Sequence, residues 1–193
     1  MTNIRLEGKN ILITGGARGI GKACAQTLAQ SGGRIAIADI DFEEARKTSS
    51  QIKNTYAYHC DFGNPANLVE LHRQIVADME TGIDIIVNNA GIISYNKEIE
   101  GLDIGEWNRL IDVNLSGAFW ACREFVADMK LKGYGKIVNL SSMAARAGGI
   151  DVGVHYTGVA GLLNLLVILD AIGRAEPRVL ARREERDSTR GRQ

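Results

Sequence analysis

Features that would place this chain outside the cytoplasm are scarce. The 193 residues include three cysteines, an odd number without a Cys-x-x-Cys pair. Such spacing argues against a disulfide framework and against a zinc site, because both need paired ligands. We therefore expect reduced thiols, a cytoplasmic protein and no bound metal.

The chain also lacks an excess of positive or negative charge. The 23 Lys and Arg residues balance the 23 Asp and Glu residues. Nothing then steers the whole chain towards nucleic acid or an anionic membrane. Residues 174–193 hold seven arginines but interleave four acidic residues. We expect a solvated or disordered Arg-rich tail there, beside a domain at residues 1–173. A basic arm for nucleic acid or an acidic partner is the alternative.

Long hydrophobic runs are absent as well. The most apolar stretch, Val159 to Ile172, is interrupted by Asn164 and Asp170 and is too short to span a bilayer. It is typical of a core helix. The first residues also lack the apolar region of a signal peptide. No membrane partner is predicted.

What the sequence does contain is a regular alternation of apolar runs and amphipathic stretches. This pattern predicts an α/β fold, a doubly wound, Rossmann-like parallel sheet in the order 3-2-1-4-5, with a ligand at the carboxyl ends of its strands. The predicted strands are Ile11–Thr14, Arg34–Ala38, Thr55–Cys60, Ile83–Asn88 and Lys136–Leu140. The predicted helices are Gly21–Ser31, Phe42–Lys53, Asn64–Glu80, Ile104–Leu131 and His155–Ile172.

A glycine-rich turn joins the first predicted strand to the first helix, and it is the most informative segment. Its glycines allow a tight turn and a close approach of the backbone to phosphates, and the helix N-terminus offers free N–H groups. The turn therefore predicts a site for the pyrophosphate of a dinucleotide. Its candidate binding residues are Gly15, Arg18, Gly19, Ile20 and Gly21.

Asp39 ends the second predicted strand, close to this turn. A carboxylate there accepts hydrogen bonds from both hydroxyls of an adenosine ribose and repels a 2′-phosphate, so it favours NAD over NADP. Arg18 argues the other way, because a cation in the turn suits that phosphate. We give Asp39 the greater weight and expect NAD as the cofactor.

A second motif, Asn88-Asn89-Ala90-Gly91, follows the fourth predicted strand. Asn tolerates turn geometry, and Gly lets a flat ligand come close. The Thr-preceded glycine turn and this tetrapeptide together resemble the short-chain dehydrogenase/reductase family. The resemblance implies cofactor contacts from Asn88, Ala90 and Gly91, and an adenine contact from Asp61. Asp61 alone is also typical of a turn.

Asn114 lies within a long helical pattern, where Asn and Gly117 favour a local distortion. A satisfied interior Asn is the alternative. The family resemblance implies that the Asn114 backbone holds a water of a proton relay. Ser142 and Tyr156 both follow the fifth predicted strand, where their hydroxyls can touch one carbonyl oxygen. They match the family's catalytic pair, with Tyr156 as acid or base and Ser142 orienting the substrate.

The sequence departs from the family immediately afterwards. The family pattern is Tyr-x-x-x-Lys, and Ala160 stands at the lysine position. An ammonium there lowers the tyrosine pKa and binds the nicotinamide ribose, which Ala160 cannot do. The last strands that relatives carry are not legible, so we expect a truncated or degenerate C-terminus.

The resulting prediction is an NAD(P)-dependent oxidoreductase that transfers hydride between the cofactor and an alcohol or ketone. Its partners would be a small-molecule substrate and further copies of itself, because the helices around Ile104–Leu131 and after Tyr156 carry the apolar faces that relatives bury on assembly. A catalytically inactive nucleotide-binding relative is the alternative.

Overall fold

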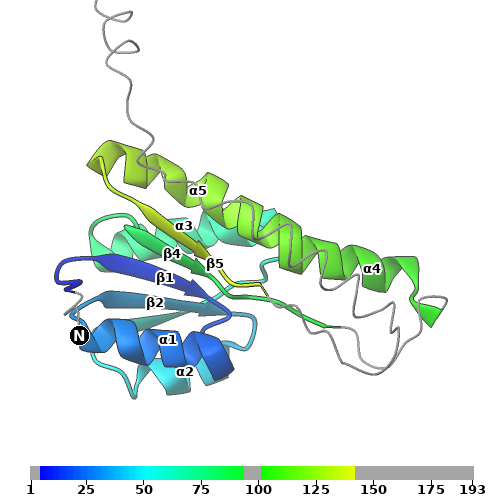
Figure 1. The fold of residues 1–193 in the computed structure, drawn as a ribbon, viewed down its shortest axis with the longest axis horizontal. Helices are drawn as coiled ribbons and strands as arrows, with labels where there is room; N and C mark the ends of the chain where they lie inside the picture. Colours follow the sequence, from blue (N-terminus) through cyan, green and yellow to red (C-terminus); the bar gives the residue numbers. More distant parts are fainter. Residues whose placement is uncertain (1–4, 94–100, 142–193) are drawn as a thin grey trace, which may run out of the picture.

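The computed structural model describes residues 5–93 and 101–141. Its centre is a sheet of five parallel strands in the order β3-β2-β1-β4-β5, which confirms the predicted order (Figure 1). The chain passes through the middle of the sheet first, moves outward to β3, and returns to the other side of β1. The strands are β1 Asn10–Thr14, β2 Arg34–Asp39, β3 Thr55–His59, β4 Ile85–Asn88 and β5 Lys136–Asn139.

β1 is the central strand of the sheet, with β2 on one side and β4 on the other. Ile11 lies opposite Ile35 of β2 and Ile85 of β4. All five residues of β1 are buried. A continuous apolar run is what a parallel strand covered on both faces requires.

Helices cover both faces of the sheet (Figure 1). Ala25 of α1 and Ala45 of α2 pack with one face, while Ile75 of α3 and Phe125 of α5 pack with the other. The arrangement is a three-layer, Rossmann-like α/β fold, as predicted. The helices are α1 Gly19–Gln30, α2 Phe42–Ser49, α3 Pro65–Met79, α4 Ile104–Ile111 and α5 Gly117–Lys132.

The long helix predicted for Ile104–Leu131 is interrupted at the expected place. A π-helical segment, η2, spans Asp112–Ser116 between α4 and α5. The amide of Gly117 donates to the carbonyl of Asp112, five residues back. Such a widened turn adds one residue to the helix, and it is often found at functional sites.

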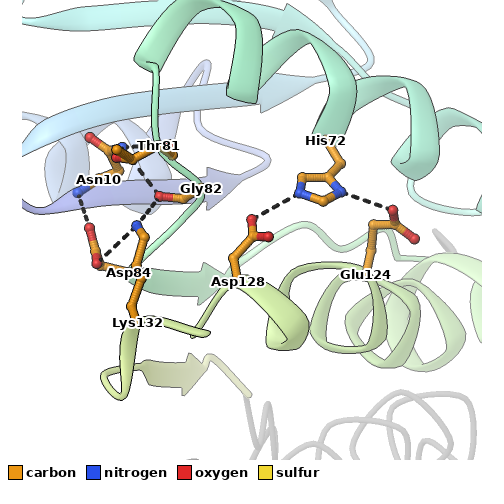
Figure 2. A network of polar contacts seen from close by, with 8 residues as sticks. All are labelled: Asn10, His72, Thr81, Gly82, Asp84, Glu124, Asp128 and Lys132. Atoms are coloured by element: carbon orange, nitrogen blue, oxygen red, sulfur yellow. Dashed lines mark hydrogen bonds and ion pairs between the residues drawn. The ribbon is translucent and has the colours of Figure 1, made fainter. Parts of the chain in front are cut away.

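α5 is fixed at the amino end of the sheet by polar contacts (Figure 2). Lys132 donates to Asp84 Oδ1 over 3.1 Å and also to the carbonyl oxygen of Gly82. Asp84 is buried, and its other oxygen accepts from the amide of Asn10 over 2.8 Å. These contacts join α5 to β1 and to the segment leading into β4.

A second contact joins α5 to α3 (Figure 2). His72 of α3 lies between two carboxylates of α5, 3.1 Å from Glu124 Oε1 and 2.8 Å from Asp128 Oδ2. Its ring also meets Phe125 edge to face, with ring centroids 5.0 Å apart. The two helices are thus held together by polar contacts as well as by apolar packing.

Element ends differ slightly from the predictions. α2 ends at Ser49 rather than Lys53, and β4 begins at Ile85 rather than Ile83. Asn54, just before β3, has a positive φ of 56°, the left-handed conformation typical of a turn. The predicted helix at His155–Ile172 and the tail at 174–193 lie outside the described residues.

Candidate functional site

The glycine turn lies between the carboxyl end of β1 and the start of α1. Gly15 and Gly19 have positive φ angles of 63° and 53°, which side-chain-bearing residues adopt only with strain. A Cβ on Gly15 would also lie 2.8 Å from the Cα of Ala90. A Cβ on Gly21 would lie 2.4 Å from the Gly15 carbonyl oxygen. The turn therefore closes on itself and on the segment after β4.

Thr14 and Asn89 lock this turn to the end of β4. Thr14 Oγ1 accepts from the amides of Asn89 and Ala90, each over 2.9 Å. The Asn89 side chain donates back to the carbonyls of Thr14 and Gly15, over 2.9 and 2.8 Å. The two sequence motifs are thus one hydrogen-bonded unit at the carboxyl edge of the sheet.

Asp39 and Thr48 hold the other side of the turn. Asp39 Oδ2 accepts from the amide of Ala17 over 3.0 Å, and Oδ1 accepts from the amide of Asp41 over 3.0 Å. The buried Thr48 of α2 donates to the carbonyl of Ala17 over 2.8 Å. Asp39 therefore lies beside the turn, as predicted, and also shapes it.

Arg18 points to acidic residues that follow β2. Its guanidinium is 2.5 Å from Asp41 Oδ2 and 4.0 Å from Glu44 Oε2. Asp41 in turn caps α2 by accepting from the amide of Glu44. The positive charge that favours a 2′-phosphate is thus balanced by two carboxylates.

α1 begins differently from α2, α3 and α4. Asp41, Asn64 and Asp103 cap α2, α3 and α4 with side-chain hydrogen bonds. Arg18, at the same position of α1, makes no such bond, and the first turn of α1 has no acidic residue. The N–H groups and the positive dipole end of α1 are available to an anion. Ile20, in this first turn, is 66% exposed.

Asp61 lies just past β3 and is held by Arg109 of α4. Its Oδ1 accepts from Arg109 Nη2 over 2.8 Å and from the Gly63 amide over 2.9 Å. Burial alone would raise the pKa of Asp61, but these hydrogen bonds and the charge of Arg109 outweigh it and hold the pKa below its usual range.

Asn88 is the last residue of β4, and its side chain contacts β5 and α5. Its side-chain amide donates to Asn139 Oδ1 over 2.8 Å and contacts Cys122 Sγ at 3.4 Å. Its own Oδ1 is buried and accepts no hydrogen bond within the described part of the chain. Ala90 and Gly91 follow at the edge, where Ala90 is half-buried and Gly91 is exposed. Asn88 therefore joins β4 to β5 and α5 through its side chain.

Asn114 belongs to η2 and clamps the segment that follows Gly91. Its Oδ1 accepts from the amide of Ile92, and its Nδ2 donates to the carbonyl of Ile92, both over 2.8 Å. The side-chain oxygen and nitrogen of Asn114 thus both have backbone partners. The distortion of the helix is confirmed at the same residue.

Ser142, Tyr156 and Ala160 lie outside the described residues. Within residues 5–93 and 101–141, no group of three His, Cys, Asp or Glu side chains is placed to hold a metal ion. The helices of this part include none with the length and apolar character needed to cross a membrane.

A glycine turn bonded to an Asn-Asn-Ala-Gly segment at the carboxyl edge of this sheet invites comparison with known families. The family model described as short chain dehydrogenase matches residues 9–165. The chain belongs to the short-chain dehydrogenase family. This is a family of oxidoreductases that bind nicotinamide cofactors.

Two relatives illustrate the likeness. A 3-alpha-(or 20-beta)-hydroxysteroid dehydrogenase of Mycobacterium bovis is 35% identical over 147 residues, which are 76% of this chain and 56% of the relative. A sorbitol dehydrogenase of Cereibacter sphaeroides is 36% identical over 164 residues, 84% of this chain and 63% of the relative. The chain thus spans less than two thirds of the length of either.

A solved structure shows the same fold with a ligand. It is a metagenomic short-chain oxidoreductase in complex with NADP. The likeness has a TM-score of 0.74 at 30% identity and covers 83% of this chain and 74% of the other. The arrangement of the sheet and turn is therefore that of the family.

Four residues that organise this edge were not among the predicted site residues. Thr14 and Asn89 lie inside the two motifs, so the sequence indicated their positions. It did not indicate the hydrogen bonds that they make. Thr48 and Arg109 gave no local signal, because their partners are 31 and 48 residues away. Only the packing of α2 and α4 brings them to the edge.

Proposed function

We propose that this short-chain dehydrogenase binds NAD at the carboxyl edge of its sheet and transfers hydride between NAD and an alcohol or ketone. One observation carries the proposal, the uncapped N-terminus of α1 beside a glycine turn and Asp39. This combination supplies N–H groups for a pyrophosphate and a carboxylate for a ribose.

The described residues fit such a cofactor. A Cβ on Gly19 would enter open space, so this glycine keeps the approach to the helix N-terminus clear. Each oxygen of Asp39 accepts one backbone N–H, and a carboxylate has about four acceptor sites in all. Asp39 therefore retains capacity for ribose hydroxyls. The pairing of Arg18 with Asp41 supports NAD over NADP.

NAD, when bound, supplies the nicotinamide ring that accepts or gives the hydride. We assign the proton at the substrate oxygen to Tyr156 and the orientation of that oxygen to Ser142, on the sequence pattern. Asn114 supports the same reaction by fixing the Ile92 backbone and, as in the family, a relay water. An ionised Asp61 would contact the adenine, with the pyrophosphate bound at Gly15, Gly19, Ile20 and Gly21 and the segment of Asn88, Ala90 and Gly91 beneath the cofactor.

The test is a calorimetric titration of the chain with NAD and with NADP. We expect NAD to bind at least about tenfold more tightly, because Asp39 opposes a 2′-phosphate. Asp39→Asn should narrow this preference. Asp41→Asn is the matched control, since it releases Arg18 and should strengthen NADP alone. Tighter binding of NADP by the unaltered chain would refute the assignment.

A second candidate function rests on Ala160, which stands where relatives carry lysine. Alanine cannot supply the ammonium that lowers a tyrosine pKa, so we expect Tyr156 to stay protonated at neutral pH and alcohol oxidation to lack its base. We propose, as this alternative, a nucleotide-binding protein with turnover reduced on the order of 10²–10⁴-fold. Rapid oxidation of simple secondary alcohols at saturating NAD would exclude it, while binding without turnover would favour it.

We further propose that the protein is cytoplasmic and self-associates. Phe119 and Leu131 of α5 are 59% and 88% exposed. β5 lies at one edge of the described sheet, with Val138 48% exposed, and an open edge favours pairing with other chains. Sedimentation velocity at micromolar concentration is the test, and a single monomeric species would contradict self-association.

A further inference from the structure

Arg109 crosses from α4 to the segment after β3, and a glycine makes room for it. The guanidinium lies over Gly63, where an added Cβ would come to 2.2 Å from Nη1. No larger residue fits at position 63 unless Arg109 moves away. The neighbouring Val113 of η2 packs against the same glycine, 3.2 Å from the added Cβ.

Only one carboxylate oxygen of Asp61, Oδ1, accepts these hydrogen bonds. Arg109 Nη2 and the Gly63 amide both donate to Oδ1. Within the described residues, no donor bonds to Oδ2. Asp61 is ionised at neutral pH, because its pKa is lowered from a value that is already acidic. Its carboxylate is therefore a fixed, acceptor-only group with one oxygen available to a ligand.

We propose that Arg109 is a positioning residue for purine recognition. By holding Asp61 through Oδ1, it presents Oδ2 to the exocyclic amine of the adenine of NAD. The inference rests on the proposed function, and it adds a chemical consequence. A carboxylate accepts from the 6-amino group of adenine but faces the 6-oxo group of hypoxanthine acceptor to acceptor, so the site prefers 6-amino purines.

A purely structural role for Arg109 must be separated from this one. α4 contains no fully buried residue, so the ion pair also helps to hold α4 on the body of the protein. Loss of α4 packing would weaken both dinucleotides alike. Loss of the Asp61 orientation would change the ratio of their affinities, which is the diagnostic quantity.

The experiment is a calorimetric titration with NAD and with nicotinamide hypoxanthine dinucleotide. We expect the unaltered chain to prefer NAD about tenfold, the effect of one well-placed hydrogen bond. Arg109→Met should reduce this preference to about twofold or less, and Arg109→Lys should restore part of it. Arg73→Met is the matched control, because Arg73 bonds Glu70 on the exposed side of α3.

Asp61→Asn is the second variant, for use if Arg109→Met unfolds, because the asparagine oxygen can still accept from Arg109. Its neutral amide should remove the preference for NAD while thermal unfolding still reports a folded chain. A full tenfold preference in Arg109→Met would overturn the positioning role. Equal binding of the two dinucleotides by the unaltered chain would overturn the recognition by Asp61 and leave the proposed function standing. Binding of neither would refute the proposed function itself.

Discussion

Replacing Gly21 by alanine tests whether the glycine turn closes as described. Alanine favours a helix over glycine by about 1 kcal/mol, so the substitution would stabilise α1 in isolation. The added Cβ, however, would lie 2.4 Å from the Gly15 carbonyl oxygen and 2.6 Å from the Asn89 side-chain nitrogen. Real Cβ atoms do not come so close, so the turn or Asn89 must move.

The expected cost follows from what must move. Overpacking of this kind costs about 1–3 kcal/mol. Displacing Asn89 also breaks its bonds to Thr14 and Gly15, each worth about 0.5–1.5 kcal/mol. After the gain in helix propensity, we expect a net loss of about 3 kcal/mol, a large share of the 5–15 kcal/mol that is usual for a domain.

Gly19→Ala is the matched comparison. A Cβ at Gly19 meets nothing within 4 Å, so only its positive φ is strained. That strain costs about 1–2 kcal/mol and is partly offset by the lower entropy of the unfolded chain. We therefore expect a loss of about 1 kcal/mol or less, together with weaker NAD binding, because the new methyl group occupies the approach to α1.

Urea unfolding followed by circular dichroism measures the stability of all three chains, and calorimetry measures NAD binding. The reasoning predicts a large difference between the two variants in unfolding free energy. A Gly21→Ala chain as stable as the original would refute the closed turn. A Gly19→Ala chain that binds NAD normally would refute the position of the pyrophosphate.

Three further outcomes follow from the described contacts. Lys132→Met should lower the unfolding free energy by about 2 kcal/mol, because the buried Asp84 loses its cation. Lys130→Met on the same helix is the control and should change the unfolding free energy by less than about 0.5 kcal/mol. Urea unfolding measures both differences. The lowered pKa of Asp61 stabilises the fold above about pH 4 and less as pH falls through that lowered value, so the stability difference between the original chain and Asp61→Asn should shrink below pH 4. Burial raises the pKa of Cys60 to about 12, so this fully buried thiol should react with a disulfide reagent only after unfolding, and mass spectrometry of the native adduct checks this.

Much of the fold was predictable because its signals are local. The strands are visible in the sequence as short, mostly apolar runs. The rule that crossover connections are right-handed then predicts their order in the sheet. The end of α3 illustrates where local signals fail. The sequence pattern continues to Glu80, but the helix ends at Met79 because Glu80 takes a positive φ of 63°.

The motifs of the candidate site can be recognised in the sequence, but the residues that hold these motifs in place cannot. Gly15 and Asp39 stand out in the sequence because their residue types match the chemistry of a dinucleotide. Thr48 and Arg109 do not, since a threonine or arginine on an amphipathic helix is ordinary until its partner is known. The role of Asn88 also required the fold, because only the pairing of β4 with β5 brings Asn139 within reach.

The π-helical segment has a further consequence for how the long helix keeps one side inward. In a regular α-helix, steps of four residues rotate about 40° each, so five steps wind about 200° around the axis. The one residue added at η2 removes about 100° of this rotation. A row spaced four apart therefore rotates by only about 100° over these five steps. It contacts first the loop after β3 and then the core. That row consists of Arg109, Val113, Gly117, Ala121, Phe125 and Met129. Deleting one residue from η2 would restore a regular helix. It would rotate the part that contacts Gly63 by about 100° relative to the part that packs in the core, so η2 sets the relative orientation of the two parts.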